Sequence, residues 1–446
     1  VTVSTTVETR GAFCSSDSSR VTTLYLATTG LGGSIPPEIG YMTELTVLNL
    51  RSNNIHGTVP TTYSRLKKLT YFGLLFNRMS GPIPDWIGEL SQLTTLALSN
   101  NLFSGYLPYS LTQMSNLNIL ALDDNELRGP IHQLSNLRGL KILYLEDNHF
   151  TDTFNGDLFV DLQELVHLDL SNNRLHGSIP LHFLDNQKFT NLQVLDLHSN
   201  FLNGTIPNVI DQNTKLQFLA VHENQFSGVV PASISNLEAL THLDLTSNKF
   251  VGPMPPQLAN MRFLIYLFLA DNPFAPGPIP EGYGELARLR DFSVKKTQRT
   301  GPIPTWLGDM NEMILLDLDS NSFTGSVPAF LGNMASLRLL LLNRNQLSGS
   351  VGQDLQSFNK LRLLLLEENS ISGNLNFICN TAADIFMMSD CASQGLTQEV
   401  VCNCCDKCCH DGEYCHGADF LARFDPIWED DYTRSVYLFQ DFNITR

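Results

Sequence analysis

The sequence predicts a solenoid of about fifteen stacked turns that ends in a cysteine-rich cap, and two observations lead to this fold class. First, a unit of the form L-x-x-L-x-L-x-x-N-x-L-x-G-x-I-P recurs along most of the 446 residues, for example from Leu45 to Pro60. Second, eight of the nine cysteines lie between Cys379 and Cys415. One such unit cannot bury its own apolar face, so neighbouring turns must stack to form a continuous core.

The asparagine of each unit sets the register of the turns. It recurs mostly at intervals of 24 residues, and Thr29 and Thr297 take its place in two turns. Its amide can donate and accept hydrogen bonds where the strand bends away and leaves backbone groups unpaired. The ladder positions are Asn53, Asn77, Asn101, Asn125, Asn148, Asn173, Asn200, Asn224, Asn248, Asn272, Asn321, Asn345 and Asn369.

The other residues of the unit have distinct positions. The two leucines of L-x-L point inward, because side chains alternate along a strand. Glycine permits the next bend, and proline fixes φ on a segment that need not donate a hydrogen bond. The outward positions lie two, four and six residues before the asparagine. Adjacent turns lie about 4.8 Å apart, so each outward column forms a nearly continuous stripe of side chains.

The G-x-I-P step resembles the plant-specific class of leucine-rich-repeat proteins. It reads GSIP at 33–36 and 177–180, GTIP at 204–207, and GPIP at 81–84, 277–280 and 301–304. The resemblance covers about four fifths of the chain, residues 21–376. It implies an α/β horseshoe or superhelix, in which parallel strands line the concave face and short 3₁₀ turns lie on the convex side.

The start of the chain resembles the end of a plant-type N-terminal cap. Gly11 and Cys14 match that cap, but Thr9 stands where it has tryptophan, and no earlier cysteine can pair with Cys14. We therefore expect residues 1–20 to form an incomplete or divergent cap. The alternating residues 1–7 are expected to add a strand over the first turn.

The cysteine-rich segment, residues 377–416, has two interpretations. Eight cysteines can form four disulfides, whose connectivity the sequence leaves open. Alternatively, C-x-x-C spacings together with His410 or His416 provide zinc ligands. A repeat ectodomain favours an oxidising compartment and therefore disulfides. The pattern at 389–409 resembles the terminal cap of leucine-rich-repeat proteins from diatoms and related stramenopile algae. The cysteines are Cys379, Cys391, Cys402, Cys404, Cys405, Cys408, Cys409 and Cys415.

Composition restricts the possible partners and the location. The formal charge of −17 argues against nucleic acid, whose phosphates require clustered lysine and arginine. No apolar run approaches the length that spans a bilayer, so any membrane anchor is expected to lie outside this sequence. We interpret the chain, which begins at Val1, as a processed extracellular or cell-surface ectodomain. Sequons at Asn203 and Asn443 are then expected to carry glycans.

The outward columns of the middle turns are rich in histidine, aspartate and aromatic residues. Two neighbouring aspartates, Asp169 and Asp196, repel each other unless a histidine, a cation or water intervenes. Imidazoles ordinarily titrate near pH 6.5, so ligand binding here should change between about pH 5 and 7.5. The alternatives are a solvated polar face and a metal site. The predicted ligand-binding residues are Tyr144, His167, Asp169, Asp196, His198, Phe218, His222, His242, Asp244, Tyr266 and Phe268.

Outward leucines gather near the cysteine-rich cap. They are Leu315, Leu339, Leu341, Leu363 and Leu365. Contiguous exposed apolar patches usually mark interfaces, so we expect a partner or the chain's own tail to cover them. Residues 411–446 carry eight Asp or Glu against three Arg, a net charge of −5, and several aromatic residues. We expect 417–446 to be an acidic aromatic tail, part of which docks, assisted by Arg338, Arg344 and Arg362.

The turn at 293–300 departs from the motif. Thr297 replaces the asparagine, Arg299 replaces the following leucine, and together with Lys295 and Lys296 this arginine is expected to form a basic cluster on the strand side. The turn is either sequence drift or a specificity loop.

The sequence favours a non-enzymatic recognition module. It has no G-x-S-x-G, P-loop, G-x-G-x-x-G or H-E-x-x-H motif, and no cofactor is expected. The leading hypothesis is a receptor-like or adhesive ectodomain that binds a protein, peptide or glycan on its concave face. The alternative is a structural subunit of an extracellular coat or filament, which would self-associate through its ends and the leucine patch.

Overall fold

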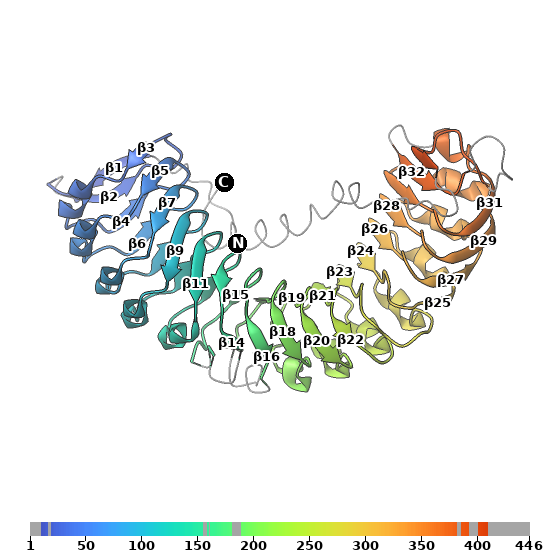
Figure 1. The fold of residues 1–446 in the computed structure, drawn as a ribbon, viewed down its shortest axis with the longest axis horizontal. Helices are drawn as coiled ribbons and strands as arrows, with labels where there is room; N and C mark the ends of the chain where they lie inside the picture. The colour runs from blue at the N-terminus through green and yellow to red at the C-terminus, as the bar shows by residue number, and fades with distance from the viewer. Residues whose placement is uncertain are drawn as a thin grey trace.

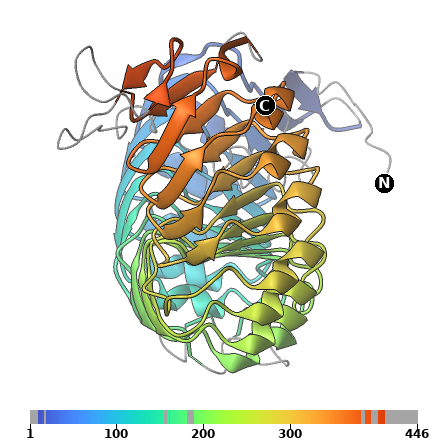
Figure 2. The ribbon, with the colours of Figure 1, turned by 90° about the vertical axis from the view of Figure 1, so that its right-hand side faces the viewer.

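The computed structural model describes residues 10–16, 19–154, 158–159, 161–180, 189–380, 385–391 and 400–408. These residues form one arc of stacked turns, with a long parallel sheet along its inner side and 3₁₀ helices on its outer side (Figure 1). Figure 2 shows the same turns end on, with the 3₁₀ helices stacked along one side of the solenoid. The predicted α/β leucine-rich-repeat solenoid is thus confirmed.

The inner, concave sheet has one strand per turn. Strand β1 (Gly11–Cys14) runs antiparallel to β2, and every later strand pairs in parallel with its predecessor. Fifteen strands, β2 to β30, correspond to the fifteen predicted turns, and β32 and β34 of the cysteine-rich segment extend the same sheet. The strands are β2 (Val21–Tyr25), β4 (Val47–Asn49), β6 (Tyr71–Gly73), β8 (Thr95–Ala97), β10 (Ile119–Ala121), β12 (Ile142–Tyr144), β15 (His167–Asp169), β17 (Val194–Asp196), β19 (Phe218–Ala220), β21 (His242–Asp244), β23 (Tyr266–Phe268), β24 (Asp291–Ser293), β26 (Leu315–Asp317), β28 (Leu339–Leu341), β30 (Leu363–Leu365), β32 (Phe386–Ser389) and β34 (Lys407–Cys408).

Short 3₁₀ helices cover the convex side. Most begin directly after the proline of the G-x-I-P step, whose fixed φ leads the chain into the turn. They are η1 (Pro37–Tyr41), η2 (Thr61–Arg65), η3 (Asp85–Glu89), η4 (Tyr109–Gln113), η5 (His132–Asn136), η7 (Asn208–Gln212), η8 (Ala232–Asn236), η9 (Pro256–Asn260), η10 (Glu281–Glu285), η11 (Thr305–Asp309), η12 (Ala329–Asn333), η13 (Gln353–Ser357) and η14 (Ile378–Asn380). Among the described residues, no helix is long and apolar enough to cross a bilayer.

Further strands pair along the lateral side in three separate sheets. The first contains β3 (Gly32–Ser34), β5 (Asn54–Gly57), β7 (Arg78–Gly81), β9 (Leu102–Tyr106), β11 (Glu126–Gly129) and β13 (His149–Phe150). The second contains β14 (Thr153–Phe154), β16 (His176–Ser178), β18 (Phe201–Gly204), β20 (Gln225–Gly228) and β22 (Lys249–Phe250). The third contains β25 (Thr300–Pro302), β27 (Ser322–Gly325), β29 (Gln346–Ser350), β31 (Ser370–Asn374) and β33 (Val400–Val401).

Arg299 lies at the gap between the second and third lateral sheets. Pro273 and Pro276 in the preceding turn have no backbone N–H to donate to a ladder. The Arg299 side chain is 2 % exposed, and its guanidinium donates to the carbonyls of Ala275, Pro278 and Thr297. The expectation that Arg299 belongs to a basic cluster on the strand side is therefore wrong, because its guanidinium is buried and binds carbonyls of its own turn and of the preceding one.

Each ladder asparagine joins its own turn to the preceding one. The Asn272 amide nitrogen donates to the carbonyls of Leu245, Leu269 and Ala270, and its oxygen accepts from the backbone N–H of Phe250. The same pattern recurs at the other ladder positions, for example at Asn101. Thr297 donates its hydroxyl to the Val294 carbonyl and so keeps one of these bonds.

The cysteine-rich segment is disulfide-bonded. The bonds join Cys379 to Cys404, Cys391 to Cys408, and Cys402 to Cys405. A C-x-x-C pair proposed as zinc ligands, Cys402 and Cys405, is thus a disulfide. Cys14 is free and exposed, as expected, and Cys409 and Cys415 lie outside the described residues, as do residues 1–7 and the tail.

Replacing Asn272 by alanine should destabilise the solenoid strongly. Three carbonyls and one N–H lose a partner at a position that is 2 % exposed, so the free energy of unfolding should fall by about 3 kcal/mol. Asn272→Thr should cost less, as Thr297 illustrates. Denaturant unfolding would measure both, with the exposed Asn54→Ala as a control expected within about 0.5 kcal/mol of wild type. Equal midpoints for Asn272→Ala and Asn54→Ala would contradict this role of the ladder.

Candidate functional site

The predicted ligand-binding residues lie side by side on strands β12 to β23 or, for His198 and His222, two residues after a strand, because the parallel register aligns their positions. Asp169 pairs with Asp196, Phe218 with His242, and His242 with Tyr266. However, most of these side chains are buried rather than solvated; Asp196 is 1 % exposed and His242 3 %. The alternative of an open, solvated polar face is therefore wrong. His198 and Tyr266 are the more accessible members of the set.

Tyr144 and His167 meet at the start of this surface. The two rings contact edge to face with centroids 4.6 Å apart, and the Tyr144 hydroxyl lies 3.1 Å from His167 Nδ1. Burial lowers the pKa of His167 to about 3, although Asp196 opposes this shift. His167 is therefore neutral near neutral pH and does not contribute to the predicted change of ligand binding between pH 5 and 7.5.

The two neighbouring aspartates carry unequal charge. Burial, and next the charge of Asp196, raise the pKa of Asp169 to about 8, while hydrogen bonds from the Ser171 hydroxyl and backbone N–H limit the shift. Burial would also raise the pKa of Asp196, but His198 and His222 outweigh it and lower that pKa below its usual range. The predicted repulsion is thus relieved because one carboxyl tends to stay protonated and the other has histidine partners.

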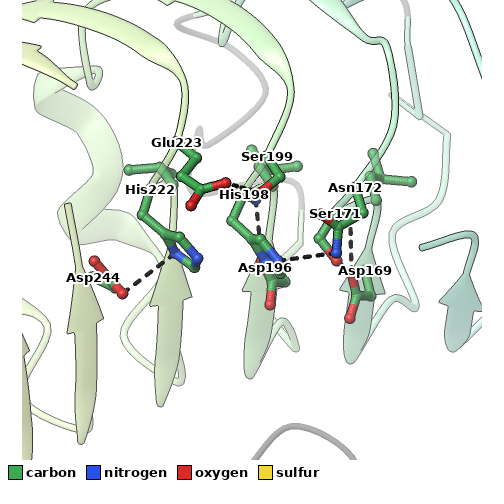
Figure 3. Close-up of polar contacts among 12 residues, drawn as sticks. Asp169, Ser171, Asn172, Asp196, His198, Ser199, His222, Glu223 and Asp244 are labelled. Atoms are coloured by element: carbon green, nitrogen blue, oxygen red, sulfur yellow. Dashed lines mark hydrogen bonds and ion pairs between the residues drawn. The ribbon is translucent and has the colours of Figure 1, made fainter. Parts of the chain in front are cut away.

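A chain of histidines and carboxylates continues from Asp196 (Figure 3). His198 Nδ1 lies 2.7 Å from Asp196 Oδ1, and the His198 ring stacks on His222 with centroids 4.2 Å apart and planes 7° apart. His222 Nδ1 lies 3.4 Å from Asp244 Oδ2. Three consecutive turns therefore share one polar network, which can offer both donors and acceptors to a ligand.

Aromatic rings lie beside this network. Phe218 stacks on His242 with centroids 4.2 Å apart, and His242 also contacts Tyr266 at 5.3 Å and Phe268 at 5.9 Å. Phe218 and Phe268 are each 3 % exposed. The site thus combines an imidazole–carboxylate network with closely packed aromatic rings, and His198 and Tyr266 are the members of the set most accessible to a ligand.

Sequence reasoning missed the residues on the rim of the site. Ser171 occupies an outward position and hydrogen-bonds Asp169, so the spacing rule was sufficient to find it. Asn172 Nδ2 lies 3.3 Å from His198 Nε2, and the Ser199 hydroxyl donates to Glu223. Asn172, Ser199 and Glu223 each directly precede a ladder asparagine, where φ is positive and simple strand alternation no longer applies. A shallow hollow of about 480 Å³ adjoins this rim and is lined in part by Asp147, His149, Asn172, Arg174, Ser199 and Phe201.

Two other kinds of site bear on the sequence analysis, a metal site as an alternative and glycosylation sites as an expectation. Within the described ranges, no three or more His, Cys, Asp or Glu side chains are grouped so that they could hold a metal ion. The sequon at Asn203 lies on β18 and its asparagine is exposed, whereas Asn443 lies outside the described residues.

The five outward leucines form one cluster, as alternation predicts, but it is not exposed as expected. Leu341, Leu363 and Leu365 are 5 %, 1 % and 3 % exposed, while Leu315 and Leu339 are half-buried. Met388 and Phe386 from the cysteine-rich segment pack against them.

The arginines beside this cluster are not equally available. Arg344 is bound by both carboxylate oxygens of Asp319, which is fully buried, whereas Arg338 and Arg362 are exposed. Arg344 is therefore already neutralised and would add little to the docking of an acidic tail.

The ionisation of Asp169 gives a testable pH dependence of stability. The pKa of Asp169 in the folded protein, about 8, lies above its ordinary value of 3.8, so the protonated side chain stabilises the folded state fully below pH 3.8. This stabilisation is lost as pH rises toward 8. The lowered pKa of His167 makes the stability of the fold rise with pH, but only below about pH 6.5. Between pH 6.5 and 8 stability should therefore fall, on the order of 1 kcal/mol, and Asp169→Asn should flatten this fall. Thermal unfolding of wild type and Asp169→Asn across this range measures the fall. If stability depends on pH with the same slope in both proteins, the raised pKa of Asp169 is contradicted.

Comparisons with known proteins agree with this architecture. Leucine-rich-repeat family models match residues 190–250, and also 44–66, 92–114 and 164–186. Receptor-like protein 39 of Arabidopsis thaliana is 40 % identical over 93 residues, which are 20 % of this chain and 10 % of that protein. The chain thus matches only about a tenth of the length of that relative.

Solved structures resemble a larger share of the chain. The plant peptide hormone receptor RGFR1, in complex with RGF2, has a TM-score of 0.68 at 28 % identity, covering 82 % of this chain and 66 % of that one. A TDR receptor has a TM-score of 0.69 at 26 % identity, covering 84 % of this chain and 77 % of that one. The chain is therefore a leucine-rich-repeat solenoid similar to the ectodomains of plant receptors.

Proposed function

We propose that the chain is a non-enzymatic, extracellular, receptor-like recognition module that binds its ligand through the middle of the concave face. The observation that carries this proposal is the continuous surface of histidine, carboxylate and aromatic side chains on β15 to β23. Chemically, that surface suits a protein, peptide or glycan. The resemblance to a peptide hormone receptor favours a peptide. The resemblance of the cysteine pattern suggests a diatom or stramenopile relative.

The structure of the surface supports ligand recognition over simple scaffolding. The inward leucines already form the core, so the core does not require histidine and aspartate at the outward positions. Burying such groups opposes stability unless they are paired, as the raised pKa of Asp169 illustrates. Buried ionisable groups with perturbed pKa values are common at functional sites. The disulfides favour an oxidising location, such as the cell exterior.

Alanine at His198, His222 and Tyr266 together should weaken ligand binding at least tenfold, because central aromatic and hydrogen-bonding groups dominate interfaces. The probe is a library of short random peptides, selected on the immobilised full chain at pH 5 and at pH 7.5. Enriched peptides should bind differently at the two pH values. A matched control replaces His56, His132 and Tyr109, which are exposed away from the concave face. If the concave triple variant binds as wild type does, the site is elsewhere.

A structural subunit of a coat or filament remains a second candidate. It is favoured by the leucine cluster at the carboxyl-terminal end of the sheet, where Leu315 and Leu339 are half-buried. End-to-end assembly through this cluster would also cover it. In this second function, the chain would associate with copies of itself instead of binding a ligand.

Sedimentation velocity at increasing protein concentration distinguishes the two functions. A recognition module should stay a monomer or small oligomer, whereas a filament subunit should polymerise and should lose assembly on Leu315→Lys with Leu339→Lys, because a charge at an apolar contact is costly. Deleting 420–446 tests whether the chain's own tail covers the leucine cluster. If it does, the deletion should raise binding of a hydrophobic dye; unchanged dye binding would exclude the tail as the covering segment.

A further inference from the structure

Phe201 is a large apolar side chain left exposed on the lateral face. It begins β18, is 53 % exposed, and borders the shallow hollow beside the candidate site. Some other exposed aromatic residues lie under an arginine, for example Tyr41 under Arg65 at 4.8 Å and Tyr106 under Arg128 at 5.5 Å. No such cation or ring contact involves Phe201 within the described ranges. A specific cover for this ring is therefore worth seeking.

The sequon lies two residues after Phe201 on the same strand. Alternation puts Phe201 and Asn203 on one face of β18, about 6.6 Å apart, while Leu202 between them points into the core. Asn203 and Thr205, the two residues that define the sequon, are both exposed. The neighbour of Asn203 on β16 is the small Ser178, so this side of the asparagine is not crowded.

The middle residue of the sequon suits this position as well. Gly204 has a φ of +82°, which disfavours other residues, and a Cβ there would lie 2.8 Å from Ser178 Cβ. Glycine thus lets β18 pass close to β16 while the sequon stays on the surface. The backbone conformation explains why glycine occupies position 204, but it does not explain why an exposed phenylalanine, Phe201, lies beside the sequon.

We propose that Asn203 carries an N-linked glycan whose first sugar packs against Phe201. The Asn203 amide nitrogen would attack the anomeric carbon of an oligosaccharide carried on a polyprenyl diphosphate. A C–N bond forms, the C–O bond to the diphosphate breaks, and the amide proton leaves with the diphosphate through a base of the transferase. No oxidant or reductant is needed.

The first sugar fits an aromatic partner at this distance. One face of a pyranose presents C–H groups, which pack on an aromatic ring and remove apolar surface from water. A sugar joined to Asn203 extends from the asparagine by several ångströms, the distance that separates the two residues along the strand. The glycan would also screen the hollow that Phe201 borders, so that a ligand approaches the histidine network from the concave side.

The test uses the full chain secreted from a eukaryotic host. Mass spectrometry of glycopeptides should find Asn203 occupied, and Asn203→Gln should remove one glycan from the intact mass. Asn443→Gln provides a control, since the residue two positions before that sequon is Asp441 and not an aromatic. An unoccupied Asn203 in the secreted protein would overturn the proposal.

A double-mutant cycle tests the contact with Phe201. Phe201→Ser should lower the unfolding midpoint by about 2 °C in the glycosylated protein and have little effect after enzymatic removal of the glycan or in Asn203→Gln. Phe76→Ser is the matched control, because Phe76 is similarly exposed at 49 % and has no asparagine two residues later. Equal effects of Phe201→Ser with and without the glycan would show that the sugar does not pack on the ring, and the proposal would fail.

Discussion

The rest of the structure depends on how the backbone is satisfied where each concave strand ends. A strand that bends leaves carbonyl and N–H groups unpaired, and the ladder asparagine binds those of its own turn and of the preceding one. The residue before it adopts a positive φ, for example Glu223 and Asp271, a conformation that non-glycine residues otherwise avoid. This repeated bend fixes the spacing of the turns, and therefore the columns of side chains on the concave face.

Close columns change the chemistry of the groups they carry. Parallel strands bring successive side chains within contact distance, so histidine rings stack and carboxylates lose their water. The result is a raised pKa at Asp169 and a lowered one at His167, although both would titrate normally on an isolated strand. Recognition by such a surface depends on the whole network, because each group sets the charge of the next one.

Periodicity was sufficient to predict the fold, the register and the columns. The asparagine spacing located the concave strands, and alternation correctly grouped the outward leucines into one cluster. Burial of the outward side chains was not predictable, since it depends on what neighbouring columns place beside each residue. Arg299 was assigned to the surface because its long-range partners, the carbonyls of Ala275 and Pro278, have no signature in sequence. Cysteine spacing likewise allowed many pairings, and only the folded segment selects among them.

The lateral side of the solenoid has a mechanical consequence. Its strands are grouped into three sheets, but backbone hydrogen bonds continue across both divisions, from Arg174 to Phe150, and from Ala275 to Gly252 and Thr300 to Gly277. The concave sheet is likewise continuous from β2 to β34. Each turn is thus held to its neighbours along both sides, so bending of the arc should be shared among all the turns. Strain applied at either end would therefore spread into many small changes and would alter the geometry of the histidine network little.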